Sequence, residues 1–220
     1  MALSKADVNN INITAVASKA IRWNSAADGF ESGALGGSMV LLSTLTASSS
    51  ATLSFVNGAS SVVLDNTYDS YVFKFINIHP ETDSADFTIN FSIDGGSNYN
   101  VTKTTTLFRA LHSEADDVAN FSYIAVDDLA QSTADLIILD RIKNDNDMSG
   151  NGTFQLFNPS NTTFIKNFIS RTAAQSGGTY QADLFIAGYG NTTSAIDAVR
   201  FKFHTGNIDS GVIKLYGIGG

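Results

Sequence analysis

The 220-residue sequence contains no cysteine, only two prolines and a single tryptophan. The absence of cysteine excludes disulfide bonds, thiolate metal sites and a cysteine nucleophile. Charged residues are also scarce: they make up 15% of the chain, below the roughly 25% that is usual in globular proteins. Serine, threonine, asparagine and glycine fill the difference, a composition typical of β-rich extracellular and virion proteins.

The charge that is present is mostly negative, with 13 Lys and Arg residues against 21 Asp and Glu residues. Nucleic-acid binding draws on clustered cations that contact phosphates, so this balance argues against a nucleic-acid partner. It disfavours binding to anionic membrane surfaces for the same reason. Apolar runs such as Met39–Leu42 are far too short to span a bilayer, and the opening residues Met1–Lys5 lead into no secretory signal. We therefore expect synthesis in the cytoplasm without a secretory signal.

Residues 1–50 differ in composition from the rest of the chain. The stretch 25–38 is rich in serine, alanine and glycine, and its glycines are Gly29, Gly33, Gly36 and Gly37. Such a composition favours an extended arm or linker. We predict that residues 1–50 form an N-terminal arm that contacts neighbouring subunits through Ile21, Trp23 and Phe30. The alternative is that this stretch supplies the first strands of the main domain.

From residue 51 onward, apolar and polar residues alternate with the period of two that indicates β-strands. Phe87, Ile89, Phe91 and Ile93 share one face of a strand, and Thr88, Asn90 and Ser92 share the other. Further strands are predicted at 53–56, 71–78, 101–108, 121–126, 136–142, 152–157, 164–171, 180–187, 198–204 and 211–218, with turn residues between them.

This pattern predicts an all-β fold, an antiparallel β-sandwich or jelly roll that spans residues 51–220. The core should contain Phe87, Phe91, Phe201 and Leu215, because each lies on the apolar face of its strand. The last two segments, 198–204 and 211–218, are predicted to pair with each other as a closing antiparallel hairpin.

Residues that could carry chemistry are few and scattered. His79, His112 and His204 lie far apart and show no metal-ligand spacing. The adjacent carboxylates of Asp116–Asp117 and Asp127–Asp128 point to opposite faces of an extended chain, so neither pair forms a catalytic dyad by itself. We predict a non-enzymatic protein with no catalytic, cofactor-binding or metal-binding residues. A glycosidase that draws two carboxylates from distant strands stays open as an alternative.

One loop partly matches a calcium-binding motif. Asp145, Asp147, Ser149 and Gly150 copy positions 1, 3, 5 and 6 of an EF-hand loop, but position 12 falls on Leu156 in place of the bidentate glutamate. The preferred interpretation is a polar turn, and a weak calcium site is the alternative.

The end of the chain carries a resemblance. The segment 210–217, with the sequence Ser-Gly-Val-Ile-Lys-Leu-Tyr-Gly, resembles the Ser-Gly-x-Ile-x-Leu-Tyr-Gly ending of structural and fibre-like virion proteins of tailed, especially marine, bacteriophages. Segments 20–30, 76–80 and 94–99 are similar to the same proteins. The resemblance implies a virion protein with a jelly-roll-like domain, located on the head, in the tail or in a fibre. It also implies assembly as a homotrimer and with other virion proteins, and it transfers no site residues.

Two alternative functions stay open beside the structural one. A receptor- or glycan-binding tip module of a phage fibre would have host surface glycans as partners and would need an exposed aromatic platform. Trp23, Tyr99, Tyr123 and Tyr189 are the residues that we consider for such a platform. A polysaccharide-degrading enzyme is the third hypothesis.

Overall fold

The computed structural model describes residues 19–23, 26, 30–34 and 39–219, and the chain divides into two compact units, Met1–Ser38 and Met39–Gly220. The described part of the first unit is an antiparallel pair of strands, β1 (Lys19–Trp23) and β2 (Phe30–Ala34). β2 lies inside the stretch 25–38 that composition predicted to be a linker. It forms a strand because β1 supplies partners for its backbone hydrogen-bonding groups.

The predicted anchors of the arm fall on this strand pair. Positions 21 and 23 lie in β1, and position 30 begins β2. Their contact with neighbouring subunits stays a prediction. Before Met39, the described residues are those of these two strands and Ala26, and all others lie outside the described ranges.

The second unit begins at Met39, earlier than the boundary predicted at residue 51. β3 (Met39–Ser50) pairs along its length with β14 (Ile208–Ile218). Ala47 is buried, and Leu42 and Leu45 pack against the core. The serines and threonines of β3 made it look like linker, but they alternate with apolar residues and tolerate an extended backbone.

The second unit is all-β, as predicted, and its described residues contain no helix. Twelve strands form one sheet, and every pairing in it is antiparallel. Between β3 and β14 lie β4 (Leu53–Val56), β5 (Ser70–Pro80), β6 (Ala85–Ser92), β7 (Lys103–Ser113), β8 (Ala119–Tyr123), β9 (Leu136–Ile142), β10 (Gly150–Phe157), β11 (Lys166–Ser176), β12 (Tyr180–Gly190) and β13 (Ala198–Phe203).

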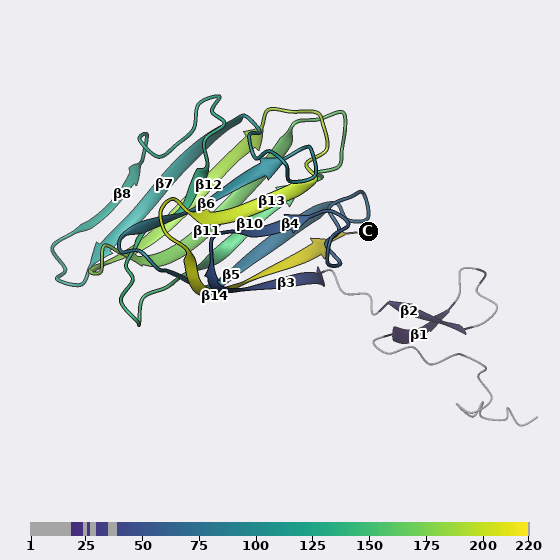
Figure 1. The fold of residues 1–220 in the computed structure, drawn as a ribbon, viewed down its shortest axis with the longest axis horizontal. Helices are drawn as coiled ribbons and strands as arrows, with labels where there is room; N and C mark the ends of the chain where they lie inside the picture. The colour runs from purple at the N-terminus through teal and green to yellow at the C-terminus, as the bar shows by residue number, and fades with distance from the viewer. Residues whose placement is uncertain (1–18, 24–25, 27–29, 35–38, 220) are drawn as a thin grey trace, which may run out of the picture. The chain divides into compact units, whose positions relative to one another are not determined.

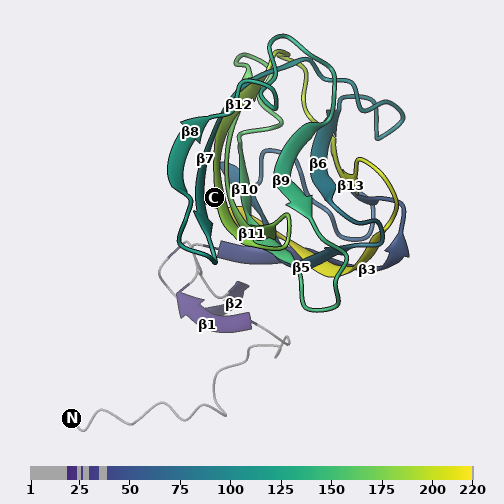
Figure 2. The ribbon, with the colours of Figure 1, turned by 90° about the vertical axis from the view of Figure 1, so that its left-hand side faces the viewer.

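The sheet consists of two parts that meet at one place. The large part has the strand order β3-β14-β5-β10-β11-β12-β7-β8, and the small part has the order β9-β6-β13-β4. β11 and β9 join them through the single pair Ser176–Ile142. Figure 1 traces the large part from β8 at the upper left to β3 at the bottom. Figure 2 shows the two parts facing each other, with β8, β7 and β12 on the left and β6, β9 and β13 on the right.

The prediction that segments 198–204 and 211–218 pair with each other is wrong. β13 pairs with β6 and β4 in the small part, and β14 pairs with β3 and β5 in the large part. The connection between them crosses from one part of the sheet to the other. Two strands that follow each other in sequence and alternate in the same way are typical of a hairpin. Here each strand pairs on both edges with strands far away in the sequence, so the two do not pair with each other.

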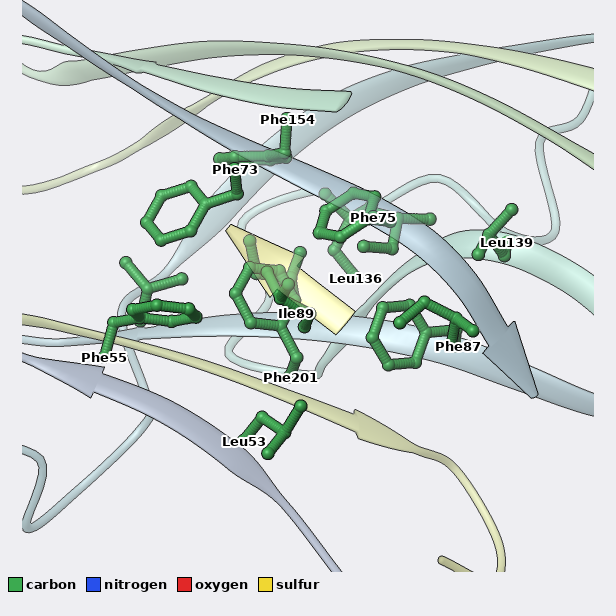
Figure 3. Close-up of a cluster of buried hydrophobic side chains, with 14 of the residues drawn as sticks. Leu53, Phe55, Phe73, Phe75, Phe87, Ile89, Leu136, Leu139, Phe154 and Phe201 are labelled. Carbon is green, nitrogen blue, oxygen red and sulfur yellow. The ribbon is translucent and has the colours of Figure 1, made fainter. Parts of the chain in front are cut away.

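The core lies between the two parts and is rich in phenylalanine (Figure 3). The ring of Phe201 on β13 lies 5.3 Å, centroid to centroid, from the rings of both Phe73 and Phe75 on β5. Its ring also stacks on Phe87 at 5.9 Å. The predicted core residues Phe87, Phe91, Phe201 and Leu215 are all fully buried, which confirms that prediction. These large rings pack with buried leucine, isoleucine and valine side chains, and their apolar burial holds the two parts together.

The polar face predicted for β6 is also buried. Thr88, Asn90 and Ser92 are at most 3% exposed, whereas Ile93, just beyond the strand, is 43% exposed. The segment before β9 reaches this face, where Thr133 and Asp135 accept hydrogen bonds from the Asn90 side chain. Polar alternation therefore marks a covered, hydrogen-bonded face here and not a solvated one.

The terminal motif 210–217 forms much of β14, which has partners on both edges. Ile213 and Leu215 are fully buried. Gly211 has φ +125°, and a Cβ atom there would lie 2.7 Å from the carbonyl oxygen of Asn77. A Cβ atom at Gly217 would lie 2.4 Å from the ring of Tyr68. The apolar and glycine positions of the motif are thus required by this fold.

Candidate binding surface

The outer face of the large part, opposite to the phenylalanine core, carries two neighbouring rows of side chains. Each row crosses the neighbouring strands β10, β11, β12 and β7, in that order. The strand register forms the first row from Thr153, Arg171, Phe185 and Phe108. The same pairings place side by side the second row Gln155, Ile169, Ala187 and Thr106. Because residues two apart in a strand share a face, the rows form one continuous surface.

These rows line a groove of about 440 Å³ that Val72 and Lys74 on β5 and Met39 on β3 extend. Ile169 is 48% exposed in the groove, and Phe185 and Phe108 are each more than one third exposed. A monomeric domain rarely leaves so many neighbouring apolar side chains in water unless a partner or ligand covers them. The groove is therefore the strongest candidate for a binding surface among the described residues.

An exposed aromatic cluster continues the groove onto the edge strand β8. Phe108 stacks on Phe121, with ring centroids 5.7 Å apart, and meets Tyr123 edge-on at 5.2 Å. Phe121, 65% exposed, also meets Phe185 at 6.5 Å. In the described chain β8 pairs only with β7. The edge of the sheet thus presents free backbone groups beside a row of aromatic rings.

Cations border the aromatic rings. The Arg171 guanidinium lies 4.7 Å from the ring centroid of Phe185, and its Nη2 donates to Asp183 at 2.7 Å. The Lys74 ammonium lies 5.5 Å from the ring of Tyr216. The hydrogen bond to Asp183 raises the pKa of Arg171, which is charged at all ordinary pH values. The groove therefore combines flat apolar surfaces with fixed hydrogen-bonding groups, as small-molecule sites commonly do.

Trp23, one of the aromatic residues considered for a platform, belongs to β1 of the first unit, and one of the three tyrosines lies in the cluster. Tyr123 lies there, 45% exposed. Tyr99 is half-buried and packs under the Arg200 guanidinium at 4.4 Å. The Tyr189 hydroxyl accepts a hydrogen bond from Gln131. The sequence did not single out Phe108, Phe121 or Phe185, although their outward positions follow from strand alternation once the register is known.

The three histidines stay apart, each with local partners. His79 Nδ1 lies 2.7 Å from the carbonyl oxygen of Met148. His112 Nε2 lies 3.2 Å from Asp116, with both side chains exposed. The backbone N–H of Asp86 donates to His204 Nδ1 at 2.8 Å. The described residues contain no group of three or more His, Asp or Glu side chains placed to hold a metal ion.

Both acidic pairs lie in turns and not in the extended chain on which the prediction depended, and the two carboxylates of each pair have different surroundings. The Ser113 hydroxyl donates to Asp117 at 2.7 Å, and the Tyr123 hydroxyl donates to Asp128. Asp127 is different: burial and the nearby carboxylates of Asp140 and Asp86 raise its pKa. These carboxylates come from distant segments, which is the arrangement that the glycosidase hypothesis required.

A network of arginines surrounds Asp140, however. Arg109 on β7 forms an ion pair with Asp140, and Arg141 Nε lies 3.1 Å from the same carboxylate. Paired carboxylates of this kind are common in structural networks, and perturbed pKa values alone do not define an active site.

The loop that partly matches a calcium motif forms a turn, in which the N–H of Met148 donates to the carbonyl of Asp145 at 2.9 Å. Asp147 and Asp209 line a polar pocket of about 410 Å³ beside this loop, together with Asn77 and His79. Two carboxylates at an open pocket are fewer than the ligand set that calcium usually requires.

Two lysines are fully buried, and the sequence patterns did not predict their burial. Lys103 and Lys166 have no exposed surface, and both pair in register with Gly190 of β12. The signal that could have found Lys103 is its place in the alternating row Val101, Lys103, Thr105 and Leu107, where the flanking apolar residues face inward.

Comparisons with known proteins add no further constraint: no family model, curated protein or solved structure matches this chain. Among the described residues, no helix has the length and apolar character needed to cross a membrane.

Proposed function

We propose that this chain is a structural, non-enzymatic component of a bacteriophage virion, as a head decoration, fibre or tail protein. On this proposal it resides in the virion and acts by assembling with copies of itself, as a homotrimer, and with other virion proteins. Its twelve-stranded unit would be a jelly-roll-like sandwich formed by the two parts of the sheet. The phage attribution depends on the resemblance of segment 210–217.

The observation that carries the assembly proposal is the apolar surface formed by the groove and the aromatic cluster. Phe121 and Tyr123, 65% and 45% exposed, belong to the edge strand β8 and lie on the same face as Ile169 of β11, which is 48% exposed. Aromatic residues that are exposed in a monomer are typical centres of protein interfaces. Low charge favours burial of such a surface, since few ions must lose water.

The proposal gives the terminal motif a structural role. Proteins with the same ending would need a close contact at their final glycine, as Gly217 has with Tyr68, and buried apolar residues at the positions of Ile213 and Leu215. On this proposal the motif residues pack the last strand into the sheet. Proteins with the same ending would then share a fold with this chain, and the motif would not indicate a shared active site.

The decisive experiment is mass spectrometry of purified phage particles combined with a particle map. The proposal expects the chain at a fixed copy number per particle and at a symmetric position. A chain found only in the cytoplasm of infected cells would contradict it. Light scattering of the purified protein should give a trimer, and a monomer at micromolar concentration would leave the symmetry to the surrounding particle.

Glycan binding is the second candidate function, and the composition of the groove favours it. Sugar rings present flat C–H faces and many hydroxyls, which match the rings of Phe108 and Phe185 beside Arg171, Gln155 and Thr153. Binding on a glycan array that is lost in Phe185→Ala but kept in Phe164→Ala, an exposed phenylalanine outside the groove, would support this candidate. A depolymerase assay with Asp127→Asn as the control tests the third, enzymatic hypothesis.

A further inference from the structure

Lys103 stands at the start of β7 with its side chain completely buried. Its Nζ lies 2.6 Å from Oδ1 of Asn90 and 2.7 Å from the carbonyl oxygen of Val101, and both of these acceptors are neutral. Burial, partly opposed by the charge of Asp135, lowers the pKa of Lys103 to about 8. A significant fraction of the side chain is therefore an uncharged amine near neutral pH, and an amine in this state is a nucleophile.

The amide of Asn90, itself only 2% exposed, is fixed and polarised by its neighbours. The backbone N–H of Phe91 donates to its Oδ1 at 2.9 Å. Its Nδ2 donates to the carbonyl of Thr133 at 3.1 Å and to Oδ1 of Asp135 at 2.8 Å. Turning the amide over would place N–H groups against N–H groups, so this orientation is determined by the network.

Asp135 is the third residue of this site and accepts the hydrogen bond from Nδ2 of Asn90. Burial raises the pKa of Asp135, but hydrogen bonds from Lys202 and Asn90 and the charges of Lys202 and Arg200 outweigh it, and the pKa lies below its ordinary value. Lys202 Nζ is 2.9 Å and Arg200 Nη2 is 3.3 Å from the carboxylate. Asp135 is therefore an ionised proton acceptor beside the Asn90 nitrogen, held in place by two cations.

We propose that Lys103 and Asn90 react with each other to form an intramolecular isopeptide bond, with Asp135 as the proton carrier. The neutral Lys103 amine adds to Cγ of Asn90, and the carbonyl electron pair moves onto Oδ1, where the N–H of Phe91 stabilises the charge. Once Nζ is bonded to Cγ, it shares that carbon with Nδ2, which donates a hydrogen bond to Asp135 at 2.8 Å. In this adduct the carboxylate takes a proton from Nζ and returns it to Nδ2. The bond between Cγ and Nδ2 then breaks, the carbonyl re-forms and ammonia leaves. One amine and one primary amide thus become one secondary amide and one ammonia, with no oxidant or cofactor.

The placement of the two residues gives the bond a clear structural effect. Asn90 lies on β6 in the small part of the sheet, and Lys103 lies on β7 in the large part. Backbone pairing joins the two parts only at β11 and β9 in the described chain. The chain already connects β6 to β7 through residues 93–102, and the isopeptide bond would close residues 90–103 into a covalent loop at this junction of the two parts. It can form only after folding, because folding brings the amine to the amide and excludes water.

The test is the intact mass of the purified full-length protein, followed by digestion. The proposal expects a mass lower than that of the sequence by one ammonia molecule. Chymotrypsin cleaves after aromatic residues such as Phe91 and Tyr99, which separates Asn90 from Lys103 in the chain. The two fragments should nevertheless remain joined, and fragmentation should locate the link at these residues. An unmodified mass, or separate fragments, overturns the proposal whether or not any variant folds.

Variants of the two buried lysines separate this reaction from other losses of ammonia, such as cyclisation of an asparagine on its own backbone. Lys103→Arg removes the nucleophile and should restore the full mass, and persistence of the ammonia loss in it would overturn the proposal. Lys166 is the matched control, since it is equally buried but its Nζ contacts only carbonyl oxygens, at 2.6 Å from Phe164 and 3.4 Å from Thr192 and Thr193. Lys166→Arg should leave the link intact.

Asp135→Asn tests the proton carrier. This variant keeps the shape of the side chain but removes the base, so linking followed from the time of expression should slow by roughly 100-fold or more, the range of general acid–base catalysis. Linking at the wild-type rate would overturn the assigned role of Asp135.

Discussion

Phe168 and Ile169 are adjacent residues of β11 with opposite environments. Phe168 is 1% exposed and contacts Phe91 and Phe154 in the core, whereas Ile169 is 48% exposed in the outer groove. The inner and outer faces of the large part both carry large apolar residues, and only the inner one is covered by the small part. Apolar character alone therefore does not assign a residue to the core, and the covering layer decides.

The largest expected loss of stability comes from the centre of the inner face. Phe201→Ala removes a fully buried ring that contacts Phe55, Phe73, Phe75 and Phe87, and we expect a decrease of about 3–5 kcal/mol in the free energy of unfolding. Urea denaturation measures it. Phe164→Ala makes the same chemical change at a side chain that is 68% exposed and should change stability by less than about 0.5 kcal/mol. Equal losses in both variants would contradict the contrast between the faces.

A methyl group added to the inner face should have the next largest effect. Gly217→Ala places a Cβ atom 2.4 Å from the ring of Tyr68, so the ring must move, at a cost of about 1–3 kcal/mol. Thermal unfolding measures the loss. Adding Tyr68→Ala to the same chain should recover part of it, because the obstructing ring is then gone. An additive double variant would show that some other contact requires this glycine.

The buried tyrosine of the inner face gives a smaller and pH-dependent effect. Burial and the charge of Asp65 raise the pKa of Tyr71 to about 12, from 10.0, and its hydroxyl donates to the carbonyl of Asp65 at 2.8 Å. Between these values the unfolded chain has released the proton and the folded chain still holds it. The contribution of this hydroxyl to stability is therefore complete below pH 10 and is lost as the pH rises toward 12.

Tyr71→Phe measures that contribution. The variant should be less stable than the wild type by about 0.5–1.5 kcal/mol at neutral pH, the usual value of one hydrogen bond. The gap in melting temperature should shrink as the pH rises from 10 to 12, because only the wild type loses stability through this group. A constant gap would mean that Tyr71 ionises at the same pH in both states.

The smallest effect on stability is expected on the outer face, where the effect on assembly should be largest. Phe121→Ser removes a ring that is 65% exposed, and the free energy of unfolding should change by less than about 0.5 kcal/mol. If the cluster is an interface, light scattering should show that the oligomer is lost. Phe164→Ser, outside the cluster, is the control and should assemble normally. A variant of Phe121 that assembles as well as the wild type would remove the cluster from the proposed interface.

Local sequence patterns predicted the strands well, and the pairing between them poorly. The segments 53–56 and 136–142 match β4 and β9 residue for residue, because alternation and turn residues act over a few neighbours. The partners of β13 and β14 were not predictable in this way, since they depend on residues far away in the chain. β3 was missed because its serines and threonines conceal a short apolar alternation.

The candidate surfaces were harder to predict for the same reason. Tyr123 was considered, but the cluster exists only when the register sets Phe108 against Tyr123 and Phe185. The alternation places Asn90 on the polar face of its strand, and its burial depends on the segment that contains Thr133 and Asp135. Sequence alternation gives the direction of a side chain, and the tertiary structure determines what it meets.

The pairing of β3 with β14 joins the first and last strands of the second unit, and this has a kinetic consequence. A chain must close a very long loop before these contacts stabilise it, and sheets of such high contact order fold in milliseconds to seconds or more slowly. While that search continues, β5 has an open edge and the phenylalanine core is incompletely covered. The interval before β14 docks is therefore the stage at which this protein is most prone to aggregate.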